Sequence, residues 1–133
     1  MSAGEVEIRS DHFQAFVNGR SLELTRREYE LIELLAGAEG RVLEREEIYS
    51  RLWGYAMVRG DRSVDVFVRK LRQKLEKASP SWRYIHTHFG IGYRFAAQSL
   101  QDHQAEQADE FSEIDVTSSV EQAGTQDTLL IAN

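Results

Sequence analysis

Apolar and polar residues alternate in residues 6–10 (VEIRS) and again in the two halves of residues 13–24 (FQAFVNGRSLEL). A two-residue period is typical of β-strands that bury one face. Asn18-Gly19 separates the halves of the second segment, and this dipeptide tolerates the positive φ angles of a type I′ turn. The segment therefore predicts a β-hairpin, with a plain loop as the alternative.

Helical spacing replaces the alternation after residue 24. Thr25 and Glu28 form a capping box, in which the hydroxyl and the carboxylate each accept a backbone N–H at the start of a helix. Apolar residues then recur every three or four positions, at Tyr29, Ile32, Leu35 and Ala36. The pattern predicts a helix that ends at Gly37 or Gly40. A second helix is expected over residues 44–53, with Ile48, Leu52 and Trp53 inward and Gly54 after its end.

A third helix, predicted over residues 62–77 (RSVDVFVRKLRQKLEK) and ended by Ser79-Pro80-Ser81, has two contrasting faces. At about 100° per residue, one stripe is apolar and is expected to face the core. This stripe comprises Val64, Val68, Leu71 and Leu75. The opposite face is cationic and rich in hydrogen-bond donors, and comprises Arg62, Val66, Arg69, Lys70, Gln73 and Lys77, with Ser63, Phe67 and Lys74 at its margin.

The last patterned segment predicts two strands, WRYIHTH and YRFAA, around the turn FGIG. Gly90 and Gly92 are expected to supply permissive φ angles there, with Tyr93 and Phe95 on the core face. A phosphate-binding loop is disfavoured because its glycines would lead into a helix N-terminus, whereas a strand follows here. His86 and His88 have the spacing of a metal site but lack a nearby third ligand. The strand surface or contact with a phosphate backbone are the alternatives for both histidines, and no metal or cofactor is predicted.

Composition and charge change this picture in one respect. The chain of 133 residues has no cysteine, which excludes disulfides and fits a reducing compartment, and its net charge of −6 argues against a nucleic-acid partner. The distribution reverses that impression, because residues 59–94 carry 9 basic and 3 acidic residues, a net charge of +6. Residues 98–133 carry 8 acidic residues and no Lys or Arg. Residues 1–58 carry 7 basic and 11 acidic residues, so a basic block lies between two acidic ones and the charge of the whole chain conceals it.

A charged helix face is often only a solvated surface, but this one has almost no acidic partners. It also presents Val66 and Phe67, for which the pattern suggests no core role. Cations that meet phosphates and guanine edges, beside apolar groups that meet thymine methyls, suit the major groove of DNA. The helix over residues 62–77 is therefore a candidate DNA-recognition helix.

Four segments in this order and spacing resemble the DNA-binding domain of OmpR/PhoB-type response regulators. They are LTRREYELIELLA, VLEREEIYSRLWG, DRSVDVFVRKLRQKLE and IHTHFGIGYRF, and the resemblance covers roughly residues 5–96. It implies an α+β winged helix-turn-helix fold, with an N-terminal antiparallel sheet, three helices and a C-terminal hairpin called the wing. It also implies that helix 62–77 enters the major groove, while the wing, residues 84–95, lies at the minor groove or backbone.

The resemblance implies site residues position by position. The family's base contacts match Val66, Phe67 and Lys70, and its phosphate contacts match Arg62, Ser63, Arg69, Arg72, Trp53, Thr87 and Tyr93. Simple core packing is the alternative for Trp53 and Tyr93. Phe89 stands where the family often has a wing-tip Arg, which leaves contact with sugar edges or with another protein open for Phe89. His88 or Arg94 would then carry phosphate contacts.

Residues 1–97 are predicted to form the winged-helix domain, and residues 98–133 an acidic tail that is disordered by default. For the tail we weigh three roles: a solubility tail, a screen of the basic helix against non-specific DNA, and recruitment of RNA polymerase. The predicted winged-helix domain starts within about ten residues of Met1, which leaves no room in this sequence for a receiver domain. A free-standing regulator and an excised fragment are both compatible with this.

Double-stranded DNA is the expected partner, bound in the cytoplasm for bacterial transcription regulation, with a dimer on tandem or palindromic half-sites as one arrangement. A winged helix that binds protein is the alternative. An enzyme is not expected, because no nucleophile–base pair, metal-spaced ligand set or phosphate motif is recognisable. No signal peptide or membrane-spanning segment is recognisable either.

Overall fold

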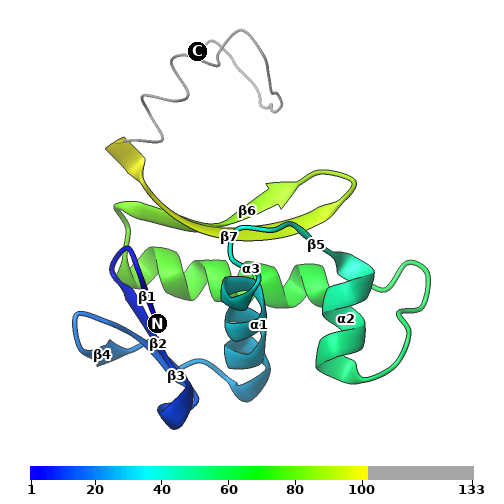
Figure 1. Cartoon of the computed structure of the whole chain (residues 1–133), viewed down its shortest axis with the longest axis horizontal. Coiled ribbons are helices and arrows are strands. Elements are labelled where there is room, and N and C mark those ends of the chain that lie inside the picture. The colour runs from blue at the N-terminus through cyan, green and yellow to red at the C-terminus, as the bar shows by residue number, and fades with distance from the viewer. Residues whose placement is uncertain (102–133) are drawn as a thin grey trace, which may run out of the picture. The chain divides into compact units, whose positions relative to one another are not determined.

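The computed structural model describes residues 1–101, in which three α-helices and two antiparallel sheets form one unit (Figure 1). The predicted acidic tail, with its expected disorder and its three candidate roles, lies outside the described residues apart from residues 98–101. Buried side chains from the three helices and from both sheets make a single hydrophobic core.

The N-terminal sheet has four strands in the order β1 (Ser2–Ala3), β2 (Val6–Arg9), β3 (Gln14–Val17) and β4 (Arg20–Ser21). A short 3₁₀ helix, η1 (Ser10–His12), connects β2 to β3. The hairpin predicted from Asn18-Gly19 is confirmed, because Val17 pairs with Arg20 and the two turn residues have φ angles of 52° and 79°. Positive φ at both central positions is the requirement of a type I′ turn.

Helix α1 (Arg26–Gly37) begins with the predicted capping box. The backbone N–H of Glu28 donates to the Thr25 hydroxyl at 3.2 Å, and the backbone N–H of Thr25 donates to the Glu28 carboxylate at 2.9 Å. The apolar stripe predicted for this helix is buried, and the helix ends at Gly37 as expected.

Helix α2 (Arg45–Trp53) begins one residue later than predicted, because Leu43–Glu44 form a short strand, β5, that the sequence pattern did not indicate. A strand of two residues has no period of its own, and β5 exists because it pairs with a strand far along the chain. Ile48 is buried and Leu52 and Trp53 are half-buried, and Gly54 ends the helix with a φ angle of 84°.

The second sheet has the order β5-β7-β6, in which β6 (Trp82–His88) and β7 (Gly92–Ser99) form the wing hairpin. Strand β7 continues two residues beyond residue 97, since Ser99 pairs with Trp82. Tyr93 and Phe95 are buried on the core face, as predicted.

The two wing glycines have different roles, and the expectation of permissive φ angles holds for only one of them. Gly90 has a φ angle of +77°, whereas Gly92 does not have a positive φ. Gly92 is required by close packing instead, because a Cβ atom there would lie 1.9 Å from the carbonyl oxygen of Leu43 on β5.

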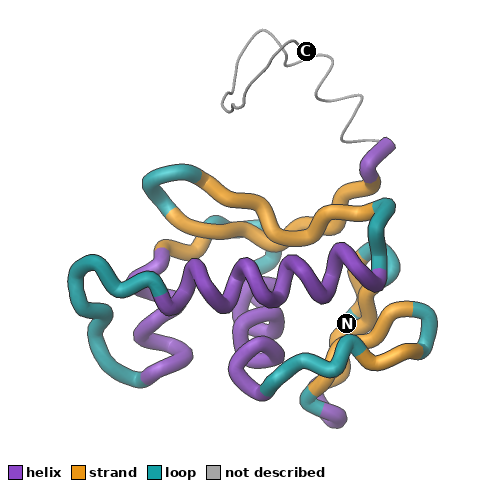
Figure 2. The backbone as a smooth tube through the Cα atoms, turned by 180° about the vertical axis from the view of Figure 1, so that it is seen from behind, coloured by secondary structure: helices purple, strands orange, loops and turns teal. Residues whose placement is uncertain are grey.

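Helix α3 (Ser63–Ala78) crosses the domain with the wing along one side and α1 and α2 along the other (Figure 2). Its bounds differ by one residue from those predicted. Helices α2 and α3 followed by the β6–β7 hairpin constitute a winged helix-turn-helix, so the predicted α+β fold is confirmed. Among residues 1–101, no helix is long and apolar enough to span a membrane.

Candidate nucleic-acid interface

Helix α3 has the two faces that its sequence predicts. Val64, Val68, Leu71 and Leu75 are all buried, with at most 3% of their surface exposed. The exposed residues on the other face are mostly cationic: Arg62, Arg69, Lys70, Gln73, Glu76 and Lys77. Within residues 1–101, no ion pair involves Arg69, Lys70 or Lys77. These side chains are therefore available for an external anion.

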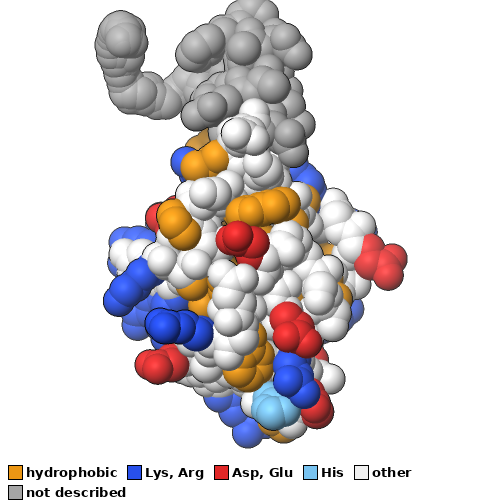
Figure 3. Space-filling view, turned by 90° about the vertical axis from the view of Figure 1, so that its left-hand side faces the viewer, with side chains coloured by type: hydrophobic (Ala, Val, Ile, Leu, Met, Phe, Trp, Pro, Cys, Tyr) orange, Lys and Arg blue, Asp and Glu red, His pale blue; other side chains and the backbone are white. Residues whose placement is uncertain are grey.

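The same positive edge is visible from the end of the domain that carries the N-terminal sheet. Blue Lys and Arg side chains gather along the left of Figure 3, which is the side that Figure 2 shows face-on, with some red and orange side chains among them. The carboxylates of α3 itself are confined to its first turn and its C-terminal part, at Asp65 and Glu76, and Glu28 of α1 pairs with Lys74.

Phe67 has a packing role that the sequence pattern did not indicate. Its ring meets the ring of Trp53 at 5.7 Å in an edge-on arrangement, and Trp53 in turn stacks on Tyr49 at 4.7 Å. The Arg27 guanidinium lies over the Trp53 ring, 4.8 Å from its centre. Trp53 and Phe67 are both half-buried and both pack on the core, so part of each ring remains exposed at the α2–α3 junction. Val66 is half-buried on the same turn of α3.

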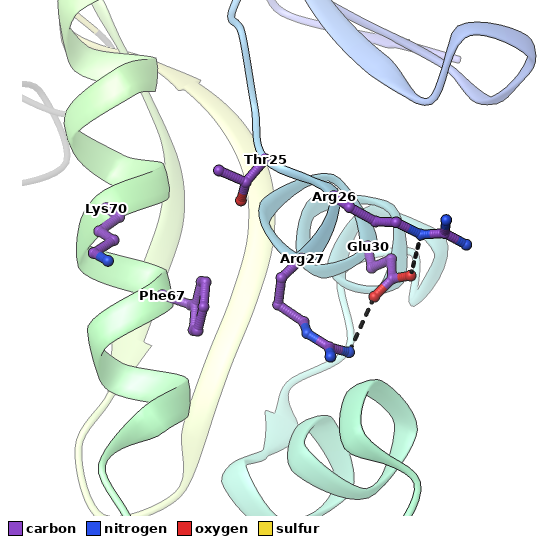
Figure 4. Close-up of a pocket in the computed structure, with 6 residues that line it drawn as sticks. All are labelled: Thr25, Arg26, Arg27, Glu30, Phe67 and Lys70. Carbon is purple, nitrogen blue, oxygen red and sulfur yellow. Dashed lines mark hydrogen bonds and ion pairs between the residues drawn. The ribbon is translucent and has the colours of Figure 1, made fainter.

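A hollow of about 520 Å³ lies beside this cluster, between the start of α1 and α3 (Figure 4). Its lining comprises Thr25, Arg26, Arg27, Glu30, Phe67 and Lys70. Glu30 pairs with both arginines, at 3.2 Å each, so three cations face one carboxylate. The hollow therefore extends the positive surface of α3 towards α1.

The sequence pattern alone does not predict a role for Arg26 and Arg27 in this surface. Cations in the first turn of a helix oppose the helix dipole, which disfavours them unless another interaction compensates. The pair of arginines directly after the N-cap Thr25 was thus an unusual feature from which this part of the surface could have been predicted.

The wing is joined to α3 by Arg72, one of the predicted phosphate contacts. Its guanidinium donates to the carbonyl oxygen of Ile85 at 2.9 Å and to the Thr87 hydroxyl at 2.6 Å, and it lies 5.7 Å from the centre of the Tyr93 ring. Burial lowers the pKa of Arg72, although a guanidinium stays protonated in proteins. The hydrogen bond between Arg72 and Thr87 therefore holds the wing against α3.

A second junction is centred on Asp65 and connects α2, α3 and the wing. Its carboxylate accepts from Arg45 at 2.8 Å and from the hydroxyl of the buried Tyr93, and it forms an ion pair with Arg62 at 3.1 Å. Burial raises the pKa of Asp65, but hydrogen bonds from Tyr93 and Arg45 outweigh it and hold the pKa below its ordinary value. Burial and the neighbouring Asp65 raise the pKa of Tyr93.

We expect Asp65→Asn to destabilise the domain by about 1–3 kcal/mol at pH 7, because Arg45 and Arg62 lose their shared anion. A carboxylate with a lowered folded-state pKa stabilises the fold above its unfolded pKa, and this contribution is lost as pH falls through the folded pKa. The gap in unfolding free energy between the two proteins should therefore narrow from pH 7 to pH 3 in urea titrations. A gap of the same size at both pH values would contradict this role.

The wing histidines bond within their own hairpin. His86 Nε2 lies 2.9 Å from the carbonyl oxygen of Ala96, and His88 Nε2 accepts from Arg94 Nε at 3.1 Å. In the part of the chain that the structure describes, no three His, Cys, Asp or Glu side chains are grouped as metal ligands would be.

The predicted site residues thus separate into two groups. Those that project outward are Arg62, Arg69, Lys70 and, at the wing tip, Phe89, with Val66, Phe67, Trp53 and Ser63 partly exposed beside them. Those that bond inward are Arg72, Thr87, His88 and Tyr93.

Comparison with known proteins identifies the family. Residues 19–95 match the family described as "Transcriptional regulatory protein, C terminal". The chain belongs to this family, the OmpR/PhoB-type regulators. Two relatives are the alkaline phosphatase synthesis transcriptional regulatory protein PhoP of Bacillus subtilis, 35% identical over 99 residues, and the response regulator ArlR of Staphylococcus haemolyticus, 40% identical over 88 residues. These alignments cover 74% and 66% of this chain, but only 41% and 40% of the relatives.

An OmpR/PhoB-type domain of known structure has the same fold. The Klebsiella pneumoniae RstA DNA-binding domain, solved in complex with the RstA box, is 29% identical and superposes with a TM-score of 0.65. The match covers 72% of this chain and 95% of the RstA domain.

Proposed function

We propose that this OmpR/PhoB-type domain binds double-stranded DNA sequence-specifically and so regulates transcription. In the proposed complex α3 lies in the major groove and the wing lies at the neighbouring minor groove or backbone. The observation that carries the proposal is the exposed face of α3, where Arg69, Lys70 and Lys77 have no carboxylate partner within residues 1–101. Uncompensated cations on the exposed face of a helix suit a polyanionic groove.

The structure suggests how the proposed contacts divide. Lys70 and Val66 reach base edges, while Arg62, Ser63, Arg69 and the exposed part of Trp53 meet phosphates. Arg72, Thr87 and Tyr93 do not contact DNA directly in this proposal. They position the wing, because their polar atoms hold it against α3. Arg26 and Arg27 add a positive surface next to Lys70 for the flanking phosphates.

The family and the relatives support this proposal. PhoP and ArlR are named as a transcriptional regulatory protein and a response regulator, and the RstA domain was solved on its DNA box. This family consists of transcriptional regulators rather than enzymes. The corresponding place of action for this chain is the bacterial cytoplasm, where the chromosome is accessible.

Selection of binding sites from random duplex DNA, with the full chain, tests the proposal. We expect one enriched motif, and a repeat of it at about one helical turn if two copies bind tandem or palindromic half-sites. If four cations meet phosphates, affinity for the selected site should fall about 100-fold between 50 and 200 mM salt. No enrichment, or binding that salt does not weaken, would overturn the proposal.

A protein-binding winged helix is the alternative, and it would use exposed side chains of the loop between α2 and α3. Tyr55 and Val58 in that loop expose 61% and 67% of their surface. An apolar contact of this kind, for example with RNA polymerase, would be insensitive to salt, so the same titration separates the two functions.

A further inference from the structure

The tip of the wing carries two exposed apolar side chains that the contacts proposed above do not use. Phe89 exposes 89% of its surface, which exceeds every other large apolar residue described, and Ile91 exposes 53%. The tip is a four-residue turn closed by the Ile91 N–H, which donates to the His88 carbonyl oxygen at 2.9 Å. Gly90 occupies its third position with the positive φ that a type II turn requires, so Phe89 is held at the second position, on the outside of the turn.

The base of this turn is fixed by contacts on both strands. His88 pairs with Gly92, and Gly92 packs directly on the backbone of β5. One step further back, Thr87 accepts from Arg72 of α3. The two apolar side chains therefore project from a rigid support, and burying them in a partner costs little ordering of the backbone.

The residues behind the tip are charged rather than apolar. Arg94 donates to His88 immediately behind the turn, and Arg62, which pairs with Asp65, caps the end of α3 from which the wing tip also projects (Figure 1). One exposed carboxylate, Glu44, lies on β5 opposite Gly92. An apolar tip with cations behind it complements a duplex, in which stacked bases lie beneath a layer of phosphates.

We propose that Phe89, supported by Ile91, is an apolar wedge that enters the minor groove and partly unstacks one base step. Apolar side chains inserted in this way bend the duplex towards the major groove. Pyrimidine–purine steps such as TA and CA/TG unstack most easily, whereas a stiff, narrow A-tract favours a cation. The wedge is thus a specificity-determining feature, which selects a flexible step beside the sequence that α3 contacts. This inference rests on the proposed DNA binding.

The test uses the full chain and two duplexes that share the selected α3 site. They differ only at the position beneath the wing, where one has a TA step and the other an A-tract. End-to-end energy transfer reports bending, and 2-aminopurine at the step reports unstacking. We expect the wild type to prefer the TA duplex, to bend it and to raise the 2-aminopurine fluorescence.

Two substitutions of the same residue should separate the wedge from a cationic wing. Phe89→Ala should lose about 10-fold in affinity for the TA duplex, together with the bend, because a stacked aromatic is removed. Phe89→Arg should bind the A-tract duplex more tightly than the wild type does and should leave it unbent. Phe13→Ala is the matched control, since Phe13 exposes 63% of its surface on the loop before β3 and lies beside Arg26 rather than the wing. This variant should keep the wild-type preference for the TA duplex and the wild-type bend.

The wedge would be overturned if Phe89→Ala bound both duplexes with wild-type affinity and bent them as the wild type does. It would also be overturned if Phe89→Ala kept this DNA binding and lost only the binding of a protein partner. Binding by α3 would stand in either case. If the wild type itself binds neither duplex in a salt-dependent way, the proposed function fails instead.

Discussion

Gly92→Ala is expected to destabilise the domain by about 3 kcal/mol or more, the upper end of the cost of overpacking a core. The added methyl carbon would lie 1.9 Å from the carbonyl oxygen of Leu43, 2.8 Å from its carbonyl carbon and 2.9 Å from the Cα of Glu44. All three atoms belong to the backbone, so no side-chain rotation relieves the clash. Strand β5 must separate from β7, and the melting temperature followed by circular dichroism should fall by about 10 °C or more.

Gly90→Ala is the matched control on the same hairpin. Gly90 has a φ angle of +77°, but a Cβ atom there meets nothing within 4 Å. Only the backbone conformation is then disfavoured, at about 1–2 kcal/mol. If Gly92→Ala melted at the temperature of Gly90→Ala or above it, the close approach of β5 would not be the reason for Gly92.

Replacing both Arg69 and Lys70 with alanine is expected to abolish tight DNA binding while leaving the fold intact, because both side chains are exposed. Lys70→Ala alone should cost about 1–3 kcal/mol and relax the preference at one base position. Arg69→Ala should instead weaken all sequences alike and reduce the slope of log affinity against log salt by about 1. Fluorescence anisotropy on the selected site and on its single-base variants measures both effects.

Arg20→Ala is the control for these variants, because Arg20 is an exposed arginine on β4 of the N-terminal sheet. It removes the same charge from another surface and should change affinity by less than about twofold, an effect of net charge alone. If the double variant bound the selected site with the affinity of the wild type, α3 would not be the recognition helix.

Local patterns were sufficient to predict most of the secondary structure. The capping box at Thr25 and Glu28, the turn at Asn18-Gly19 and the apolar stripe of α3 each depend on residues close together in sequence. Strand β5 could not be predicted in this way, because Leu43 and Glu44 are extended only by pairing with Tyr93 and Gly92.

The candidate site was predicted less completely, for the same physical reason. Periodicity indicates that Arg72 is not on the apolar stripe of α3, but not that its guanidinium meets Ile85 and Thr87 on a strand that folds back beside it. The partners of Asp65 and of Phe67 are likewise supplied by α2 and the wing. Which polar side chains remain free for a ligand is decided by these long-range contacts.

The bonds from Arg72 to the wing and from Tyr93 to Asp65 fix the spacing between α3 and the β6–β7 hairpin before any ligand is met. In the proposed complex, one rigid body must then satisfy two neighbouring grooves at once. The offset between those grooves depends on how tightly the duplex is wound. The affinity of the domain for one unchanged sequence should therefore depend on the helical twist of the duplex, and so on the superhelical tension of the DNA that carries the site.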